Sequence, residues 1–331
     1  MADTMTDGGT APEPALDAAD ASRVADVAQR IRTEIERVIV GQSSTVEAAV
    51  ACVLARGHLL IEDIPGVGKT LLAQALAASI GGSFHRIQGT PDLLPGDVTG
   101  SMVPTGDGHE LRFRSGPIFS NVVVFDELNR ANPRTQSALL EATEESAVTV
   151  DGLTRSLPSP FVLVATQNPL EMVGTYPLGE GALDRFMAVV TPGRPGVDAE
   201  VDVLTGRRGR TRLSSIEPVV DIGDIVGAQE AVAHVAIADS IARWIVEVLT
   251  ATRLHPRVRL GASTRGGVAL VGLAKARAAM LGRHYVVPDD VVSLAVPALA
   301  HRLVVANAAG SVDAGREVVT ECLARVPVPS A

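Results

Sequence analysis

The chain has 331 residues, of which 46% are hydrophobic and 20% are charged, and its formal net charge is -9. This length and composition predict a globular protein with one large core and a second, smaller one. Charged residues interrupt every apolar run well before roughly 18 residues, and no basic segment precedes an apolar one at the start, so we expect no membrane span and no signal peptide.

The first 21 residues are rich in Ala, Asp, Thr, Gly and Pro, and this composition predicts a disordered, acidic tail. Ser22 is placed to cap a helix, because apolar residues then recur with helical spacing as far as Val38. VIVGQ, residues 38–42, leads into a second helix that we expect to end near Arg56.

The next segment, DIPGVGKT at 63–70, links an apolar strand (58–62) to a helix that we expect to run to Gly81. Glycines let backbone N–H groups turn inward around a polyphosphate, and the helix N-terminus adds partial positive charge. Lys69 would reach the outer phosphates, and the Thr70 hydroxyl would ligate Mg²⁺. Asp63 stands where the full pattern has Gly, so the start of the loop departs from it. A glycine-rich turn without a ligand is the alternative.

Three more strands are expected, at 84–88, at 121–126 and at 161–168, and MAVVTPG (187–193) has the pattern of a last one. An irregular stretch from Thr90 contains a small hairpin near Leu111 and Phe113, and it has the character of an insertion. Asn132 and Pro133 begin a helix to about Glu145. Asp151-Gly152, between alternating residues, then predicts a hairpin with a type I′ turn.

Polar side chains at two strand ends supply candidates for hydrolysis. Asp126 is suited to holding Mg²⁺ through its water shell, and the adjacent Glu127 to activating the attacking water. Asn168 could bind the γ-phosphate or that water. The simpler alternatives are an acidic pair that begins a loop or caps a helix, and an ordinary turn residue at position 168.

Two arginines could complete the site. Arg185 in GEGALDRF is a candidate finger that reaches the nucleotide of an adjacent subunit, an effect worth on the order of 1000-fold in rate. Arg265 in GASTRGG, at the start of a later helix, could sense the phosphates. Either could instead be a surface ion-pair partner.

Beyond about Pro195 the strand patterns stop. GRRGRTR, residues 206–212, has the character of a solvated, basic connection rather than a phosphate site. The following helical patterns predict a second, all-helical domain. The expected division is a tail at 1–21, a nucleotide-binding core at 22–195, a linker at 196–212 and helices at 213–328, in which helical patterns lie near 222–233, 236–253, 263–282, 288–302 and 313–325.

Several other chemistries are disfavoured. Cys52 and Cys322 are the only cysteines, and both lie in apolar segments, which favours inert thiols in a reducing cytoplasm. The seven histidines have no metal-ligand spacing, and we expect them to be structural. A net charge of about -4 without the tail, together with 3% aromatic residues, disfavours general nucleic-acid binding.

Residues 30–305 resemble a MoxR-type AAA+ ATPase. The matching stretches are VIVGQ, LIEDIPGVGKTLLAQALA, RIQGTPDLLPGDVTG, GPIFSNVVVFDELNRANPRTQSALLEATEE, VTVDG, PFVLVATQNPLEMVGTYPLGEGALDRF, LGAS with TRG, and the late VVPDDV with HRL. Asp63 and Thr264, where Gly and often Pro are expected, depart from the pattern.

The resemblance implies an α/β P-loop core, with a parallel sheet sandwiched by helices, a helix-2 insert at 90–120 and a pre-sensor-1 hairpin at 147–157. An all-helical lid would follow, with ATP and Mg²⁺ bound between core and lid. It implies a Walker A motif at 66–70, Walker B at Asp126 and Glu127, sensor 1 at Asn168, an arginine finger at Arg185 and sensor 2 at Arg265. The nucleotide contacts expected are Gly41, Gln42, Pro65, Gly66, Val67, Gly68, Lys69, Thr70, Leu71 and Arg265.

The resemblance also implies a ring, usually a hexamer, that acts as a chaperone-like ATPase in maturation, metal insertion or assembly of a protein client, often with a VWA-domain partner. The alternative from another class is a nucleic-acid motor. The hairpin disfavours it, because Asp151 and Arg155 are its only charges whereas a DNA-gripping tip should be basic. A nucleotide-switched scaffold that hardly turns over is a third interpretation, and Glu127 and Arg185 argue against it.

Overall fold

The computed structural model describes residues 16–64, 66–105, 110–169, 173–194, 196–205, 207, 210–306 and 312–329. Its centre is a five-stranded parallel sheet in the order β2-β5-β8-β1-β9. The strands are β1 (Leu59–Glu62), β2 (Phe84–Gln88), β5 (Val122–Asp126), β8 (Val162–Gln167) and β9 (Ala188–Val190). This arrangement confirms the expected α/β fold.

The sheet is covered on both faces, as its continuous apolar strands require. Because successive side chains of a strand point to opposite faces, Leu59 and Ile61 join one apolar cluster and Leu60 joins the other. The first cluster contains α1 (Ala18–Glu36), α2 (Ser43–Leu54) and α3 (Lys69–Ser79), and the second contains α5 (Pro133–Glu145), with the short α4 (Pro95–Thr99) and η1 (Leu128–Arg130) on the same side.

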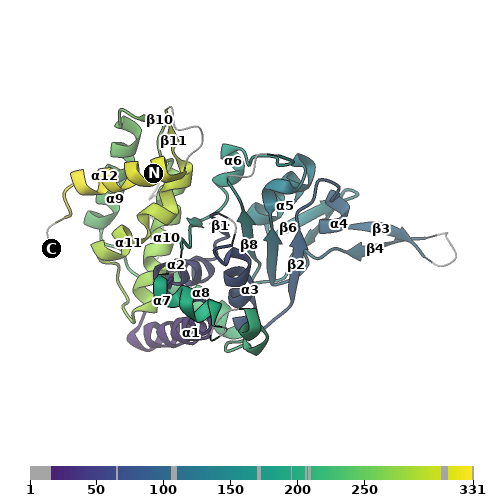
Figure 1. Cartoon of the computed structure of the whole chain (residues 1–331). Helices are drawn as coiled ribbons and strands as arrows, with labels where there is room; N and C mark the ends of the chain where they lie inside the picture. The colour runs from purple at the N-terminus through teal and green to yellow at the C-terminus, as the bar shows by residue number, and fades with distance from the viewer. Residues whose placement is uncertain are drawn as a thin grey trace, which may run out of the picture.

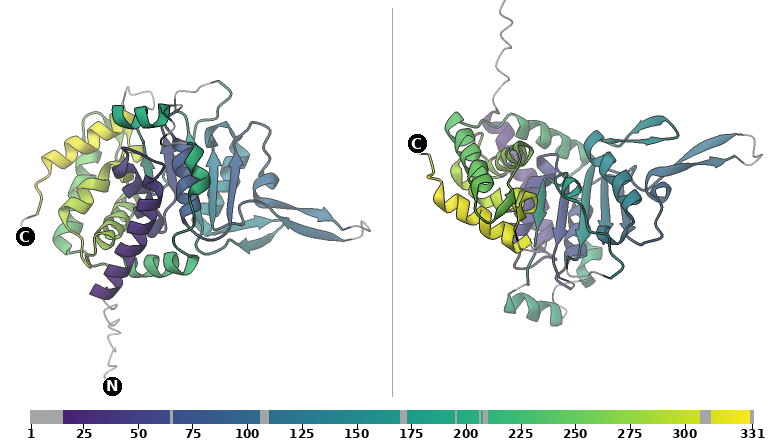
Figure 2. Two further views of the ribbon diagram at one scale, coloured as in Figure 1. Left: turned by 60° about the horizontal axis from the view of Figure 1, so that its bottom comes forward. Right: turned by 90° about the horizontal axis from the view of Figure 1, so that it is seen from above.

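Two hairpins leave the core, as the sequence predicts. The β3 (Gly100–Pro104) and β4 (Leu111–Ser115) pair projects well beyond the body in both views of Figure 2. The second pairs β6 (Ala147–Val150) with β7 (Leu153–Ser156), and its turn has φ 50° at Asp151 and 75° at Gly152. Positive φ at both turn residues is the type I′ geometry expected of Asp-Gly.

The C-terminal helices gather on the opposite side from the β3–β4 hairpin (Figure 1). Their bounds agree closely with the expected helical patterns. They are α8 (Ile222–Ala233), α9 (Asp239–Leu254), α10 (Thr264–Met280), α11 (Pro288–Leu299), η3 (Ala300–Arg302) and α12 (Val312–Arg325). A small α6 (Glu180–Leu183) lies between β8 and β9 in sequence.

Three details of the predicted organisation were wrong. Helix α1 begins at Ala18, inside the expected tail, because the Asp17 side chain accepts a hydrogen bond from the Asp20 backbone and Ala21 is buried. The C-terminal part is not all helical, since β10 (Val258–Leu260) pairs with β11 (Val304–Val305). The expected linker contains helix α7 (Val197–Leu204) and then η2 (Arg210–Ser215).

The N-terminal and C-terminal helices share one core. Helix α1 packs against α8 and α10, and α2 packs against α10 as well. Among the described residues, no helix is both long and apolar enough to cross a membrane. Cys52 and Cys322 are buried and unbonded to each other, and burial raises the pKa of the Cys52 thiol to about 12, as expected of an inert thiol.

Candidate active site

A large cleft lies at the carboxyl ends of the central strands, where parallel α/β sheets bind their ligands. Its volume is about 1280 Å³. The described residues that line it come from six segments: Val38, Ile39, Val40 and Gln42; Ile64 and 66–71 with Gln74; Arg86; Glu127 and Arg130; Thr166, Gln167 and Asn168; and Arg194, Ala199, Glu200, Leu204 and Leu213.

The phosphate loop forms the floor of this cleft. Gly66 and Gly68 have φ of 89° and 91°, a left-handed region that side chains disfavour, and α3 begins directly after Gly68. The Lys69 ammonium lies back across the loop and donates to the carbonyls of Asp63 and Ile64. Pro65 lies outside the described residues. The other expected loop residues, Val67, Thr70 and Leu71, line the cleft.

Asp63 has a definite role at the start of the loop. One carboxylate oxygen accepts from the Ile64 backbone at 2.7 Å, and the other accepts from the Gly193 backbone at 2.6 Å. Gln42 supports the same region, because its side chain amide donates to the Val67 and Gly193 carbonyls at 3.5 and 3.4 Å. Gly41, with φ 76°, provides the turn before Gln42 and is not among the lining residues.

The two oxygen ligands expected for a metal lie together. The Thr70 hydroxyl donates to Asp126 Oδ1 at 3.0 Å, and Thr166 donates to the same oxygen at 3.2 Å. Hydroxyl and carboxylate oxygens are the hard donors that Mg²⁺ prefers, so the residues present fit this ion. Arg86, which the sequence analysis did not single out, occupies the other side of Asp126, with 2.6 Å between its Nε and Asp126 Oδ2.

Glu127 follows Asp126 in a left-handed conformation, with φ 57°. Its Oε2 accepts from the Gln88 amide at 2.9 Å and lies 3.2 Å from Arg130 Nε. A Cβ on Gly89 would come within 2.2 Å of the Glu127 carbonyl oxygen, so only glycine permits this approach of β2 to β5. Arg86 and Gln88 lie two residues apart on β2, so their side chains point to the same face of the sheet. This spacing could have identified them from sequence as partners of Asp126 and Glu127.

Asn168 lies at the cleft, directly after β8, and its backbone carbonyl accepts from Asn129 at 3.1 Å. The preceding residue, Gln167, donates to Glu62 at the end of β1. Glu62 is buried, and burial raises its pKa, with the Gln167 hydrogen bond acting in the opposite direction. This hydrogen bond therefore joins the end of β1, which precedes the phosphate loop, to the end of β8, which precedes Asn168.

Arg185 and Arg265 are not brought to this cleft. Neither lines it, and both instead contact Glu144 near the end of α5, at 2.9 Å from Arg185 Nη2 and 2.8 Å from Arg265 Nη2. The expectation that nucleotide binds between the core and the C-terminal helices stays a prediction. Arg194, Leu213 and three residues of α7 line the cleft, and none of its described lining residues comes from α8 to α12.

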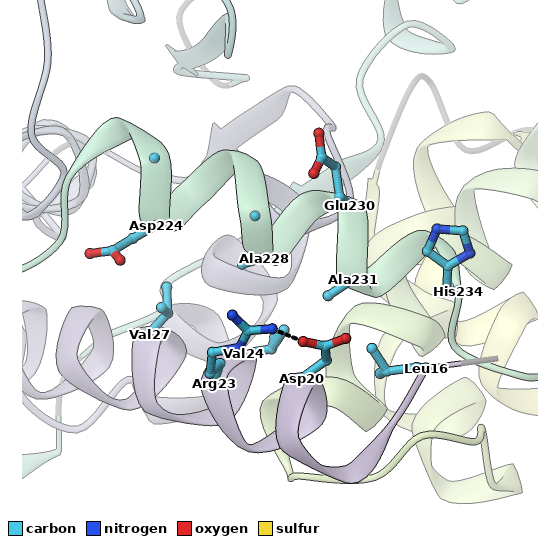
Figure 3. Close-up of a pocket in the computed structure, with 12 residues that line it drawn as sticks. Leu16, Asp20, Arg23, Val24, Val27, Asp224, Ala228, Glu230, Ala231 and His234 are labelled. Atoms are coloured by element: carbon cyan, nitrogen blue, oxygen red, sulfur yellow. Dashed lines mark hydrogen bonds and ion pairs between the residues drawn. The ribbon is translucent and has the colours of Figure 1, made fainter. Parts of the chain in front are cut away.

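A second pocket, of about 470 Å³, lies between α1 and α8 (Figure 3). Its lining includes Asp20, Asp224 and Glu230, and Asp20 is paired with Arg23. Three carboxylates against one paired arginine disfavour a phosphate ligand. The described residues hold no cluster of His, Cys, Asp and Glu that could bind a metal ion. The cleft at the strand ends is therefore the candidate active site.

Comparison with known proteins gives consistent results. Residues 58–188 match the family model described as "ATPase family associated with various cellular activities (AAA)", and residues 250–322 match the AAA lid domain. YeaC of Bacillus subtilis is 47% identical over 89% of this chain and 92% of its own length. Chaperone MoxR1 of Mycobacterium tuberculosis is 35% identical over 95% of this chain and 87% of its own.

A crystal structure of a presumptive ATPase from Cytophaga hutchinsonii has the same fold. It superposes with a TM-score of 0.82 at 32% identity and covers 94% of this chain and 98% of its own.

Proposed function

The chain belongs to the MoxR family of AAA+ ATPases, and from this premise we propose a ring ATPase, expected to be a hexamer, whose sites are shared between subunits and whose hydrolysis remodels a protein client. The observation that carries the proposal is the separation of the arginines from the cleft. Arg185 and Arg265 lie together on Glu144 and not among the residues around the phosphate loop. This separation supports a role for both arginines at the nucleotide of a different subunit.

Within one subunit, the cleft residues would bind ATP and prepare the water. Backbone N–H groups of 66–70 and the Lys69 ammonium would hold the phosphates, with Lys69 exchanging the Asp63 and Ile64 carbonyls for phosphate oxygens. The apolar side chains of Val38, Val40 and Leu213 would contact the base. Mg²⁺, held by Thr70 and through water by Asp126, would neutralise charge on the β- and γ-phosphates.

Glu127 would accept the proton of the attacking water, and Asn168 would orient that water or the γ-phosphate. In the described state Glu127 is held by Gln88 and Arg130. A carboxylate oxygen that is occupied by two donors is not free to accept a proton from water, so we expect these contacts to loosen when the site is complete.

The arginines of the neighbour would then supply the missing positive charge. Arg185 and Arg265 have half-exposed side chains, at 31% and 50%, so an approaching subunit can reach them. Arginines supplied across an interface stabilise the charge that develops in phosphoryl transfer. Assembly would therefore be a condition for turnover.

The client role has indirect support. One relative is named a chaperone, and the two hairpins give this chain structural elements beyond the nucleotide core. We propose maturation, metal insertion or assembly of a protein, with a VWA-domain protein as the partner, in the cytoplasm that two free, buried thiols suit. A nucleic-acid motor is the competing function. The β6–β7 hairpin supports it poorly, because Arg155 is stacked over the Phe113 ring at 4.0 Å.

The shared site can be tested with purified protein. Specific ATPase activity should rise with protein concentration, and Arg185→Ala should abolish turnover while leaving nucleotide affinity intact. Lys69→Ala should lose ATP affinity, measured with a fluorescent nucleotide. Constant activity per subunit across a hundredfold dilution would contradict the ring, and unchanged binding by Lys69→Ala would contradict the phosphate-loop assignment.

The client is tested by capture with Glu127→Gln, which should bind ATP without hydrolysing it. We expect a VWA-domain protein, or an enzyme that lacks its metal, to remain bound from a native lysate in ATP and not in ADP. Recovery of nucleic acid that survives physiological salt would favour the motor instead.

A further inference from the structure

Glu144 binds the two candidate arginines at once. Its Oε2 lies 2.9 Å from Arg185 Nη2 and its Oε1 lies 2.8 Å from Arg265 Nη2, so each carboxylate oxygen holds one guanidinium. The three residues come from three separate elements. Glu144 is near the end of α5, Arg185 follows α6, and Arg265 lies in the first turn of α10. Ion pairs of this kind to arginine are charge-assisted and directional.

A second carboxylate, that of Asp184, contacts Arg265 as well as Arg302. Asp184 Oδ1 lies 2.7 Å from Arg302 Nε, and Asp184 Oδ2 lies 3.6 Å from Arg265 Nε. Arg302 is buried and donates to the backbone carbonyls of Asp184 and Phe186, at 2.9 and 3.0 Å. Arg185 itself donates to the Gly181 carbonyl at 2.9 Å. The arginine pair is thus attached both to the nucleotide core and to the C-terminal helices.

Two guanidinium groups this close repel each other unless an anion lies between them. Without Glu144, each long side chain would also sample several rotamers. Fixing it in one rotamer would then cost conformational entropy each time ATP is hydrolysed. With Glu144, the pair keeps a net positive charge and one arrangement. Hydrogen bonding from Arg265 also lowers the pKa of Glu144, so the carboxylate stays ionised at neutral pH.

We propose that Glu144 is a positioning residue that holds Arg185 and Arg265 as one unit, so that the γ-phosphate bound by the neighbouring subunit meets both guanidiniums together. This inference rests on the proposed function, because it requires the arginines to act across the subunit interface. It adds a residue that contacts neither nucleotide nor water. It also makes the angle between α10 and the core a determinant of turnover.

The first measurement separates positioning from binding. Glu144→Gln keeps the size of the side chain and removes its charge, and it should lower kcat on the order of tenfold with KM and ATP affinity unchanged, because the subunit's own phosphate loop is intact. Glu145→Gln, at the next and exposed position, is the matched control and should retain full activity. A Glu144→Gln enzyme with normal kcat would overturn the proposal.

The second measurement asks whether Glu144 acts in the subunit next to the one that hydrolyses. A Lys69→Ala subunit has no working phosphate loop and keeps its arginines, whereas a Glu144→Gln subunit has the reverse defect. A mixture of the two should exceed the summed activities of its components. Absence of any gain, while Arg185→Ala does complement Lys69→Ala, would overturn the role of Glu144 and leave the shared site standing. Failure of Arg185→Ala to complement would contradict the shared site itself.

The third measurement excludes a role in folding alone. In an Arg185→Ala, Arg265→Ala background, in which turnover is already abolished, Glu144→Gln should leave the unfolding midpoint in urea unchanged, since nothing remains to be positioned. A lower unfolding midpoint there would assign Glu144 to the packing of α5 and overturn the proposal.

Discussion

At the scale of single residues, Asp126 is a buried carboxylate with three side-chain partners. It is 2% exposed, and it receives the hydroxyls of Thr70 and Thr166 on one oxygen and the Arg86 guanidinium on the other. A buried carboxylate requires such partners, because an unpaired buried charge is strongly unfavourable. Arg86 therefore acts as the counter-ion of Asp126 when no divalent cation is bound.

This geometry predicts competition between Arg86 and Mg²⁺. Arg86→Gln should lower the Mg²⁺ concentration needed for half-maximal binding of a fluorescent ATP analogue by about threefold or more, because a nearby positive charge is removed from the metal's ligand. Binding in EDTA is the reference that isolates the metal-dependent part. Arg112→Gln, on the exposed strand β4, should leave the Mg²⁺ titration unchanged. An unchanged titration for Arg86→Gln would refute the competition.

His58 shows how a buried ring affects stability without serving the site. Its Nδ1 accepts from the Leu163 backbone at 3.1 Å, so Nε2 carries the proton and donates to the Thr143 carbonyl at 3.0 Å. Burial lowers the pKa of His58 from 6.5 to about 4. Between these two values the unfolded chain binds a proton that the folded chain refuses, so the stability present above pH 6.5 is lost as pH falls toward 4.

The consequence can be measured with a variant that cannot titrate. At pH 5.0 this histidine should reduce the unfolding free energy by about 2 kcal/mol relative to pH 7.5. His58→Gln should be less stable at pH 7.5 and should lose about that much less between the two pH values in urea unfolding. Equal losses for the variant and the unaltered protein would show that His58 does not carry this pH dependence.

At the scale of elements, the sequence predicted what local patterns determine. The bounds of α8 and the turn at Asp151-Gly152 follow from spacing and turn chemistry, and the structure confirms both. The position of Arg265 does not follow from such patterns, because the packing of α10 on α1, α2 and α11 sets the direction in which its first turn points. Likewise β10 and β11, with three and two residues, are too short to show alternation.

Asp63, which stands where the phosphate-loop motif has glycine, stabilises the loop. Its two backbone hydrogen bonds tie the loop after β1 to Gly193 after β9, the neighbouring strand. Asp63→Gly restores the residue that the motif expects, yet it should lower the unfolding free energy by about 1–2 kcal/mol and weaken ATP binding several-fold. Asp92→Asn, at an exposed position, is the control. Tighter ATP binding by Asp63→Gly would contradict this account.

At the scale of the whole molecule, the two regions that match separate family models share a core. One apolar cluster contains Val24 of α1, Leu72 of α3 and Leu270 of α10. An ion pair also joins the N-terminal and C-terminal helices, since Arg277 of α10 contacts Glu47 of α2 at 2.6 Å. The fully buried Asp290 of α11 holds the same arginine at 2.7 Å. A nucleotide-driven movement of the C-terminal helices would therefore have to be transmitted through, and not around, this packed region.

The shared core predicts that the chain unfolds as one unit. Trp244, the single tryptophan, is 2% exposed in α9 and reports the C-terminal helices alone, whereas far-UV circular dichroism reports the entire fold. The two urea transitions should coincide. Asp290→Ala leaves Arg277 and Arg283 without their buried carboxylate, and it should lower the unfolding free energy from both probes by about 3–5 kcal/mol. Asp289→Ala, at an exposed position, is the control and should lower it by less than about 1 kcal/mol. If the Trp244 transition preceded the circular dichroism transition, the C-terminal helices would be a separate folding unit, and the coupling of Glu144 to α10 could not be a rigid one.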